Sequence, residues 1–156
     1  MKQILLLLLL FTTSFSYSQS KKKFIKEGNK LYSDSSYNQA EMKYRKSLEK
    51  DQEYFNASFN LADAVYKQER YDESSSFFES LKNNARNNKE LANINHNLGN
   101  SLLKENKIDL SIEAYKNSLR LNPNDEDTRY NLAYAQKMKQ QQEQQQEQQQ
   151  EQQQEQ

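Results

Sequence analysis

Cysteine and tryptophan are absent from this chain of 156 residues, and histidine and proline occur once each. Without cysteine the chain can form neither a disulfide nor a thiolate metal site. The single histidine, His96, excludes a histidine pair as a set of metal ligands. An excess of charge of one sign is also missing, because 22 basic residues balance 22 acidic ones. Nucleic acid and anionic surfaces are therefore not expected as main partners, since binding to them needs a basic excess.

A catalytic constellation is missing too. His96 is expected to face solvent or to line a groove, and no nucleophile and carboxylate are recognisable as its partners. The carboxylates are spread along the chain, and those at Asp72 and Glu73 and at 125–127 suit the positive N-terminal ends of helices. We therefore expect no enzymatic activity, no bound metal and no cofactor.

The apolar run Ile4–Phe11 is too short to cross a membrane, because it reaches about 12 Å as a helix and a bilayer core is about 30 Å thick. Lys2 precedes this run, and Ser16 and Ser18 lie at positions −3 and −1 of a cut before Gln19. The layout predicts a secretory signal peptide over residues 1–18, with an uncleaved N-terminal anchor as the alternative. We expect export across the inner membrane into the periplasm.

Apolar residues are also missing from the C-terminal end of the chain. From Gln140 onward glutamine is interrupted only by glutamate at every fourth place, so neither a core nor a coiled-coil seam can form. Glutamine is a fair helix former, but glutamates four residues apart repel each other by roughly 0.2–0.5 kcal/mol. Residues 140–156 are expected to form a solvated low-complexity tail, either disordered or a fraying extension of a helix.

Glycine is scarce, and its two occurrences have matching surroundings. Gly28 and Gly99 are each followed by an asparagine, and a tyrosine follows each of them sixteen residues later. With Ala62 and Ala133 they form a column of small residues whose steps are 34, 37 and 34 residues. Other columns keep the same steps: Tyr37, Tyr71 and Ile108; Ala40, Ser74 and Ser111; Leu61, Leu98 and Leu132. The chain therefore contains an internal repeat.

Each repeat carries two helical patterns. In the second repeat Leu61, Ala62, Val65 and Tyr66 lie on one face of a 3.6-residue helix, and a second face starts at Tyr71 after the break KQER. Breaks of about four residues force neighbouring helices to run antiparallel. No stretch alternates in the manner of a β-strand. The pattern predicts an all-α chain built of helical hairpins.

A helix pair with a period of 34 residues resembles the tetratricopeptide repeat family, and the resemblance extends over about residues 21–138. It implies a right-handed helical-hairpin solenoid of three repeats at 21–54, 55–88 and 92–125. A capping helix at 126–139 would close the end of the solenoid, as repeat proteins require.

The glycines then have a packing role. We expect Gly28 to meet Ala40, and Gly99 to meet Ser111, where two helices cross. Closer packing would offset the roughly 1 kcal/mol that glycine costs within a helix. Ala133, in the same column, is expected to face back onto the third repeat together with the leucine before it.

Asparagine recurs in two further columns. Asn60, Asn97 and Asn131 each come directly before the leucine of their repeat, and Asn29 and Asn100 directly follow the two glycines. An asparagine amide donates and accepts at once, so a row of such amides can hold an extended peptide backbone. The alternative is that these amides bond only within the chain or to water.

The resemblance to tetratricopeptide repeats implies that these columns line a concave groove, where Asp63 takes the asparagine's place in the second repeat. The peptide-binding residues that it implies are Asn29, Asn60, Asp63, Tyr66, Asn97, Asn100, Asn131 and Tyr134. Members of the family that bind a peptide's terminal carboxylate also use basic groove residues. Here those slots hold Ile25, Asn93 and Asn97, so recognition of a terminal carboxylate is not expected.

The whole arrangement of signal peptide, three repeats, the stretch LRLNPNDEDTRYNLAYAQKM and a glutamine-rich tail resembles the BatC-type proteins of the bacterial aerotolerance operon. That resemblance implies a protein or peptide partner, namely membrane-bound proteins with von Willebrand A domains. Contact with a membrane is expected only through such a partner or through an uncleaved N-terminus. The alternative function is a structural adaptor in cell-envelope assembly or division.

Overall fold

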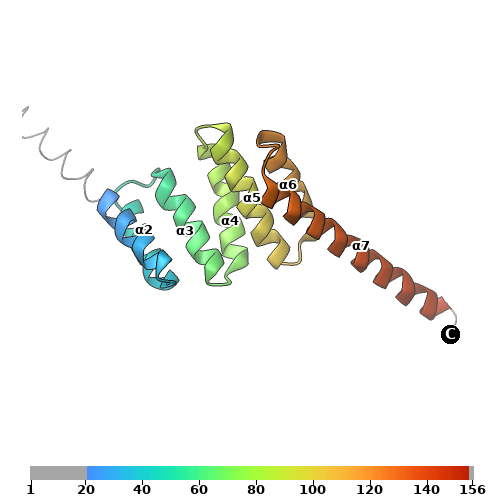
Figure 1. Cartoon of the computed structure of the whole chain (residues 1–156). Helices are drawn as coiled ribbons and strands as arrows, with labels where there is room; N and C mark the ends of the chain where they lie inside the picture. The colour runs from blue at the N-terminus through green and yellow to red at the C-terminus, as the bar shows by residue number, and fades with distance from the viewer. Residues whose placement is uncertain (1–20, 155–156) are drawn as a thin grey trace, which may run out of the picture. The chain divides into compact units, whose positions relative to one another are not determined.

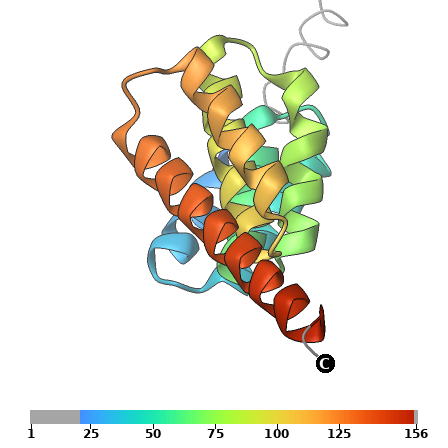
Figure 2. The ribbon, with the colours of Figure 1, turned by 90° about the vertical axis from the view of Figure 1, so that its right-hand side faces the viewer.

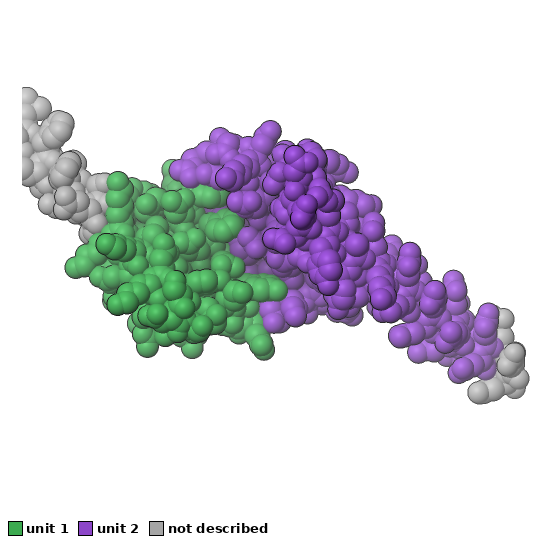
Figure 3. Space-filling view, viewed as in Figure 1, with its two compact units in different colours: residues 1–70 green, residues 71–156 purple. Residues whose placement is uncertain are grey.

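The computed structural model describes residues 21–154, and the expected signal peptide at 1–18 lies outside them. The chain forms two compact units, of which the first ends at Arg70 and the second begins at Tyr71 (Figure 3). This boundary falls inside the expected second repeat, between its two helices.

The first unit contains a helix over residues 21–33, followed by α2 (Tyr37–Leu48) and α3 (Phe55–Lys67) (Figure 1). α2 packs against α3. Ala40 and Tyr44 of α2 are buried, as expected of the small and aromatic columns.

The second unit continues the series of hairpins. Its described elements are α4 (Tyr71–Leu81), the short 3₁₀ helix η1 (Lys82–Asn84), α5 (Asn88–Lys104), α6 (Ile108–Leu121) and α7 (Glu126–Gln154). α4 and α6 pack against α5, and α7 packs against α6 (Figure 2). No strand occurs among residues 21–154, and the prediction of an all-α chain of helical hairpins is confirmed.

Buried serines make the same hydrogen bond in both units. Ser47 Oγ donates to the carbonyl of Lys21 at 3.0 Å, and Ser118 Oγ donates to the carbonyl of Ala92 at 2.8 Å. Each bond ties the second helix of a hairpin to the N-terminal turn of the first. Neither serine therefore leaves a buried hydroxyl unsatisfied.

The turns inside the hairpins are built without glycine. Ser35, Glu69 and Asn106 occupy one position in three successive turns, with φ angles of 58°, 63° and 60°. The next amide bonds back to the carbonyl five residues earlier, as from Ser36 to Leu31 at 2.8 Å, which is the Schellman ending of a helix. For a residue with a Cβ atom this left-handed conformation costs roughly 1–2 kcal/mol. It nevertheless occurs at each of these three turns.

The structure corrects the expected orientation of the last helix. Ala133 is exposed, whereas Thr128 and Ala135 are buried and Leu132 packs against buried side chains of α6. In α5, the face that carries Gly99 packs against α6. No helix follows α7 within residues 21–154, so the corresponding face of α7, which carries Ala133, has no helix to cover it.

α7 also continues beyond the expected end of the capping helix at Lys139 and reaches Gln154. From Gln140 onward every described side chain is exposed, and these turns extend beyond α5 and α6 (Figures 1 and 2). The glutamine-rich segment is therefore a helical extension of α7 in the described part of the tail.

Truncation after Lys139 is expected to leave the thermal unfolding midpoint unchanged. The removed residues bury no apolar side chain, so they cannot offset an ordering entropy of about 1–2 kcal/mol per residue. The far-ultraviolet helical signal should fall, while the midpoint measured by circular dichroism stays that of the full chain. A clear drop in the midpoint would mean that the tail docks on the second unit.

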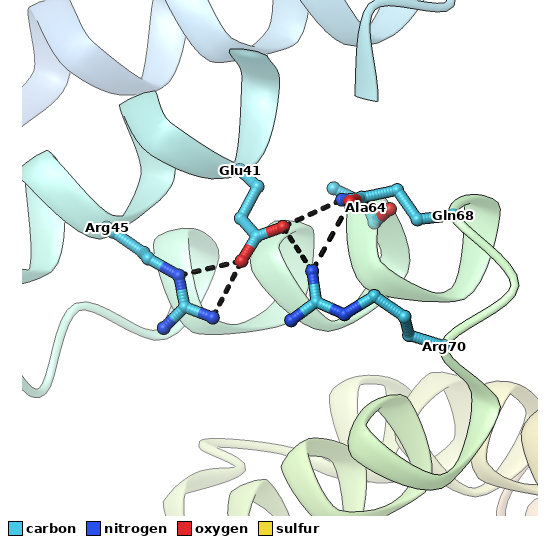
Figure 4. Close-up of polar contacts among 5 residues, drawn as sticks. All are labelled: Glu41, Arg45, Ala64, Gln68 and Arg70. Carbon is cyan, nitrogen blue, oxygen red and sulfur yellow. Dashed lines mark hydrogen bonds and ion pairs between the residues drawn. The ribbon is translucent and has the colours of Figure 1, made fainter. Parts of the chain in front are cut away.

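A nearly buried carboxylate joins α2 to the end of α3. Glu41 is 9% exposed, and its oxygens accept hydrogen bonds from Arg45 Nε at 2.8 Å, Gln68 Nε2 at 2.8 Å and Arg70 Nη1 at 2.7 Å (Figure 4). Burial by itself would raise the pKa of Glu41. Hydrogen bonds from Gln68 and Arg45 and the charges of Arg45 and Arg70 outweigh it and hold this pKa below its usual value of 4.5.

Glu41→Gln is expected to lower the free energy of unfolding by about 1–3 kcal/mol at neutral pH, because two cations lose their acceptor. The pKa of Glu41 is lower in the folded chain than in the unfolded one. Its contribution is therefore fully present well above pH 4.5 and is lost as the pH falls through the folded value. Urea unfolding at pH 7 and pH 3 should show the variant approaching wild type in acid. An equal deficit at both pH values would contradict the charge-based account, and Glu53→Gln, at an exposed carboxylate, is the control.

Candidate functional site

An asparagine next to the glycine lies at the polar centre of the first unit. Asn29 Oδ1 accepts hydrogen bonds from the Tyr44 hydroxyl at 2.9 Å and from Asn60 Nδ2 at 2.9 Å. The helix over 21–33, α2 and α3 each contribute one of these residues, so the contact joins all three helices.

The second unit repeats this arrangement 71 residues later. Asn100 Oδ1 accepts from the Tyr115 hydroxyl at 2.8 Å and from Asn131 Nδ2 at 3.0 Å, which joins α5, α6 and α7. We call each set of three residues a Tyr–Asn–Asn cluster. Two of the three predicted asparagines of the Asn60 column thus bond within the chain, which is the alternative that the sequence left open.

The tyrosine rings of these clusters lie against the glycines. A Cβ atom added at Gly99 would lie 2.5 Å from Tyr115 Cε1, and one added at Gly28 would lie 2.5 Å from Tyr44 Cε1. This corrects the neighbours expected from the sequence, because the atoms nearest to Gly99 belong to the tyrosine ring and not to Ser111. At Gly28 the nearest atoms likewise belong to the Tyr44 ring and not to Ala40. Each glycine makes room for an aromatic ring whose hydroxyl reaches the adjacent asparagine.

A pocket of about 260 Å³ opens between the helix over 21–33 and α3 in the first unit. It is lined by Asn29, Tyr32, Ser33, Tyr44, Asn60 and Asp63. Burial, a hydrogen bond to Asp63 and the charge of Asp63 raise the pKa of Tyr32 above its usual range. Burial and the charge of Asp63 also raise the pKa of Tyr44 to about 12, against a lowering effect of Asn60.

In the second unit two tyrosines of α7 stand out from the surface, with Tyr130 72% and Tyr134 50% exposed. Asn97 of α5 is half-buried, and its side-chain amide makes no hydrogen bond within the part of the chain that the structure describes. An amide and two phenol rings are therefore available to a ligand on this unit.

The eight predicted site residues fall into two groups. The structure brings Asn29, Asn60 and Asp63 together in the first unit and joins Asn100 to Asn131 in the second. The remaining predicted residues lie outside the Tyr–Asn–Asn clusters: Tyr66, Asn97 and Tyr134. Peptide binding by these eight residues stays a prediction.

His96 is not a solvent-facing side chain. Its Nδ1 lies 2.6 Å from Thr128 Oγ1, and its ring meets the Tyr115 ring edge-on at 6.2 Å between centroids. Burial lowers the pKa of His96, against the opposing charges of Asp125 and Asp127. Since the Thr128 amide also donates to Asp125 Oδ1 at 3.0 Å, His96 helps to fix the start of α7.

Among residues 21–154, no group of three or more histidine, cysteine or acidic side chains is placed to hold a metal ion. No helix in that range combines the length and the apolar character needed to cross a bilayer.

Two features of the site were missed by sequence reasoning. Tyr44 and Tyr115 were noticed at their fixed distance from the glycines, and that spacing was the signal for the contact they make. Glu41 carries no signal in the sequence, because the equivalent position in the third repeat is Ile112 and a lone glutamate is ordinary on a helix face.

Two family models match the chain. Residues 31–94 match one described as tetratricopeptide repeat, and residues 99–140 match one described as TPR repeat. No curated protein matches the chain in sequence.

Solved structures share the fold. The first TPR domain of Spaghetti (RPAP3), bound to the HSP90 peptide SRMEEVD, superposes with a TM-score of 0.71 at 19% identity, over 78% of this chain and 94% of that one. The TPR2AB domain of yeast Sti1, in a complex with pHSP90, has a TM-score of 0.71 at 23% identity, over 81% of this chain and 50% of that one. YrrB, described as a TPR protein with an unusual peptide-binding site, has a TM-score of 0.65 at 23% identity, over 80% and 63%. With the repeated columns, the helical hairpins and these matches in agreement, the chain is built of tetratricopeptide repeats.

Proposed function

We propose that this protein is a non-enzymatic scaffold that binds an extended segment of a partner protein on its first-helix face. That face is defined by the helix over 21–33 with α3 in the first unit, and by α5 with α7 in the second. The observation that carries the proposal is made in each unit separately: the first has the Asp63 pocket, and the second has the exposed Tyr130 and Tyr134. Two solved structures with this fold are described by a peptide ligand or a peptide-binding site, which supports a peptide as the ligand class.

The hydrogen-bonding groups of this face suit a peptide backbone. The Asn97 amide has both its donors and its acceptor available. Asn60 and Asn131 use one Nδ2 donor each within their clusters and keep the carbonyl oxygen as an acceptor. The phenol rings of Tyr130 and Tyr134 can bury apolar parts of the same segment, since tyrosine offers large contact area at low entropic cost.

The experiment is capture of partners from an envelope extract, followed by calorimetric titration of the captured segment. Asn97→Ala combined with Tyr134→Ala is expected to weaken binding by about 1.5–4 kcal/mol, from one lost set of hydrogen bonds and one lost aromatic contact. Leu110→Ala is the control, because Leu110 is an exposed residue of α6, outside the first-helix face. Wild-type affinity in the double variant together with a loss in Leu110→Ala would move the site to the surface of α4 and α6.

The proposal places the protein outside the inner membrane, in the periplasm. It rests on Lys2, on the short apolar run that follows it, and on Ser16 and Ser18 before the expected cleavage site at Gln19. Mass spectrometry of the protein from its native cells is expected to find Gln19 at the N-terminus. Recovery of a chain that begins at Met1 would contradict cleavage.

Within this function, the proposed pathway is a stress or aerotolerance complex of the BatC type, with membrane-bound von Willebrand A-domain proteins as partners. The arrangement of leader, repeats and glutamine-rich tail supports it, and an adaptor in envelope assembly or division is the second candidate. Neighbouring genes for a MoxR-type ATPase and A-domain proteins would favour the first. Capture of cell-wall or division proteins in their place would favour the second.

A further inference from the structure

The pocket at Asp63 has chemistry that its counterpart in the second unit lacks. The Tyr–Asn–Asn cluster beside it recurs 71 residues later, but Tyr32 and Asp63 correspond there to Leu103 and Tyr134. The first unit therefore presents a carboxylate where the second presents an aromatic ring. This difference gives the two units different ligand preferences.

Asp63 carries a charge that the first unit does not neutralise. Other partly buried carboxylates of this unit have cations beside them: Glu27 pairs with Lys43 at 2.6 Å, Asp51 with Lys21 at 2.5 Å, and Glu41 with two arginines. Asp63 is half-buried and is the one charged residue of its pocket. Across residues 21–154 no lysine or arginine forms a salt bridge with it. Burial is the main cause of the raised pKa of Tyr32 and of Tyr44, and the charge of Asp63 adds to the rise at both tyrosines.

The hydrogen bonds inside the pocket leave acceptors for a ligand. The Tyr44 hydroxyl and Asn60 Nδ2 both donate to Asn29 Oδ1 and fill its two lone pairs. The Asn60 carbonyl oxygen remains as an acceptor, and the Asp63 carboxylate, which already accepts a hydrogen bond from Tyr32, keeps further lone pairs. A group that offers several donors and no acceptor fits this set, and a guanidinium is such a group.

The size and walls of the pocket favour the same group. A volume of about 260 Å³ is below the roughly 300–1,000 Å³ of whole-ligand pockets, so it suits a single side chain. The Tyr32 ring is held edge-on against the Tyr37 ring at 5.2 Å between centroids. Tyr32 lines the pocket, and an aromatic ring attracts a cation, with arginine better suited than lysine because its planar guanidinium also stacks.

We propose that the pocket at Asp63 binds the guanidinium group of an arginine side chain from the partner segment. The carboxylate takes the charge, the Asn60 oxygen takes a further N–H, and the Tyr32 ring borders the cation. The identification of the arginine as part of a partner peptide rests on the proposed function, whereas the cation pocket itself does not.

The test is a nuclear magnetic resonance titration of the purified protein with N-acetyl-arginine amide. The side-chain amides of Asn29 and Asn60 report on the pocket, and those of Asn100 and Asn131 are an internal control on the cluster without a carboxylate. We expect saturable shifts at Asn29 and Asn60 at millimolar probe and none at the control pair. The isosteric but neutral N-acetyl-citrulline amide should cause at most a tenth of the saturation at equal concentration, since a lost charge pair in a partly buried site is worth roughly tenfold.

Asp63→Asn, which keeps the shape of the side chain and removes its charge, should abolish the arginine-dependent shifts, while Glu53→Gln should leave them unchanged. Equal shifts with arginine and citrulline probes, equal shifts at both clusters, retention of the shifts in Asp63→Asn, or no saturable shift at all would each overturn the proposal. Partner capture is measured in the same preparations. Partner capture without arginine-dependent shifts would contradict the cation pocket alone. Arginine-dependent shifts without partner capture would contradict the scaffold function alone.

Discussion

Gly99→Ala is expected to lower the free energy of unfolding by up to about 2 kcal/mol, although alanine is the better helix former. The exchange gains about 1 kcal/mol of helix propensity. Against this, the new Cβ would lie 2.5 Å from Tyr115 Cε1 and 2.6 Å from Tyr115 Cδ1. The Tyr115 ring is completely buried and its hydroxyl is held by Asn100, so it cannot swing aside. Overpacking of this kind costs about 1–3 kcal/mol, and Gly99→Leu should cost more and unfold the third hairpin.

Ala133→Leu is the matched control, because Ala133 occupies the same column in α7 and is exposed. It should change the free energy of unfolding by less than about 0.5 kcal/mol. A second test combines Gly99→Ala with Tyr115→Leu, in which the colliding ring is gone and the two effects should not add. Chemical unfolding that shows Gly99→Ala more stable than wild type, by the roughly 1 kcal/mol of helix propensity, would mean that the ring moves and that the glycine has no packing role.

The glycines show what sequence columns can and cannot predict. The spacing of Gly28 and Gly99 correctly indicated small residues at a helix contact. It did not identify the atoms in contact. The side chain of Tyr115 is long enough to reach back over one helical turn, so it fills the space beside Gly99 that was expected for Ser111, four residues earlier in the chain. The αL turns were equally hidden, since Ser35 and Glu69 are not residues that favour a positive φ. Their conformation follows from the closure of the hairpin rather than from local preference.

Polar pairings were harder to predict than packing. The asparagine columns could be read from the sequence, but their bonds run between different columns and through a tyrosine of the intervening helix. No period in the sequence encodes such a three-helix contact. Glu41 illustrates the same limit, because its partners Gln68 and Arg70 belong to a turn at the far end of α3 and become neighbours only after the helices pack.

Asn100→Ala is the second substitution for which a large loss is expected, about 1.5–3 kcal/mol in the free energy of unfolding. The change removes the oxygen that accepts from both the Tyr115 hydroxyl and Asn131 Nδ2. The Tyr115 ring is buried, so its hydroxyl cannot turn to bulk water without moving the ring, and an unsatisfied buried donor costs about 1–3 kcal/mol. Thermal and urea unfolding measure the loss.

Asn97→Ala is the control in the same helix, because the Asn97 amide has no partner among the described residues, and it should cost less than about 0.5 kcal/mol. Asn100→Asp keeps an oxygen acceptor in place and should lose less stability than Asn100→Ala, which separates the acceptor from the mere loss of volume. Equal losses in Asn97→Ala and Asn100→Ala would show that the cluster adds nothing beyond ordinary surface contacts.

The comparison also matters for function. Removing Asn60 or Asn131 disturbs a cluster as well as any ligand contact, so Asn97 is the member of its column whose removal tests peptide binding without changing the fold.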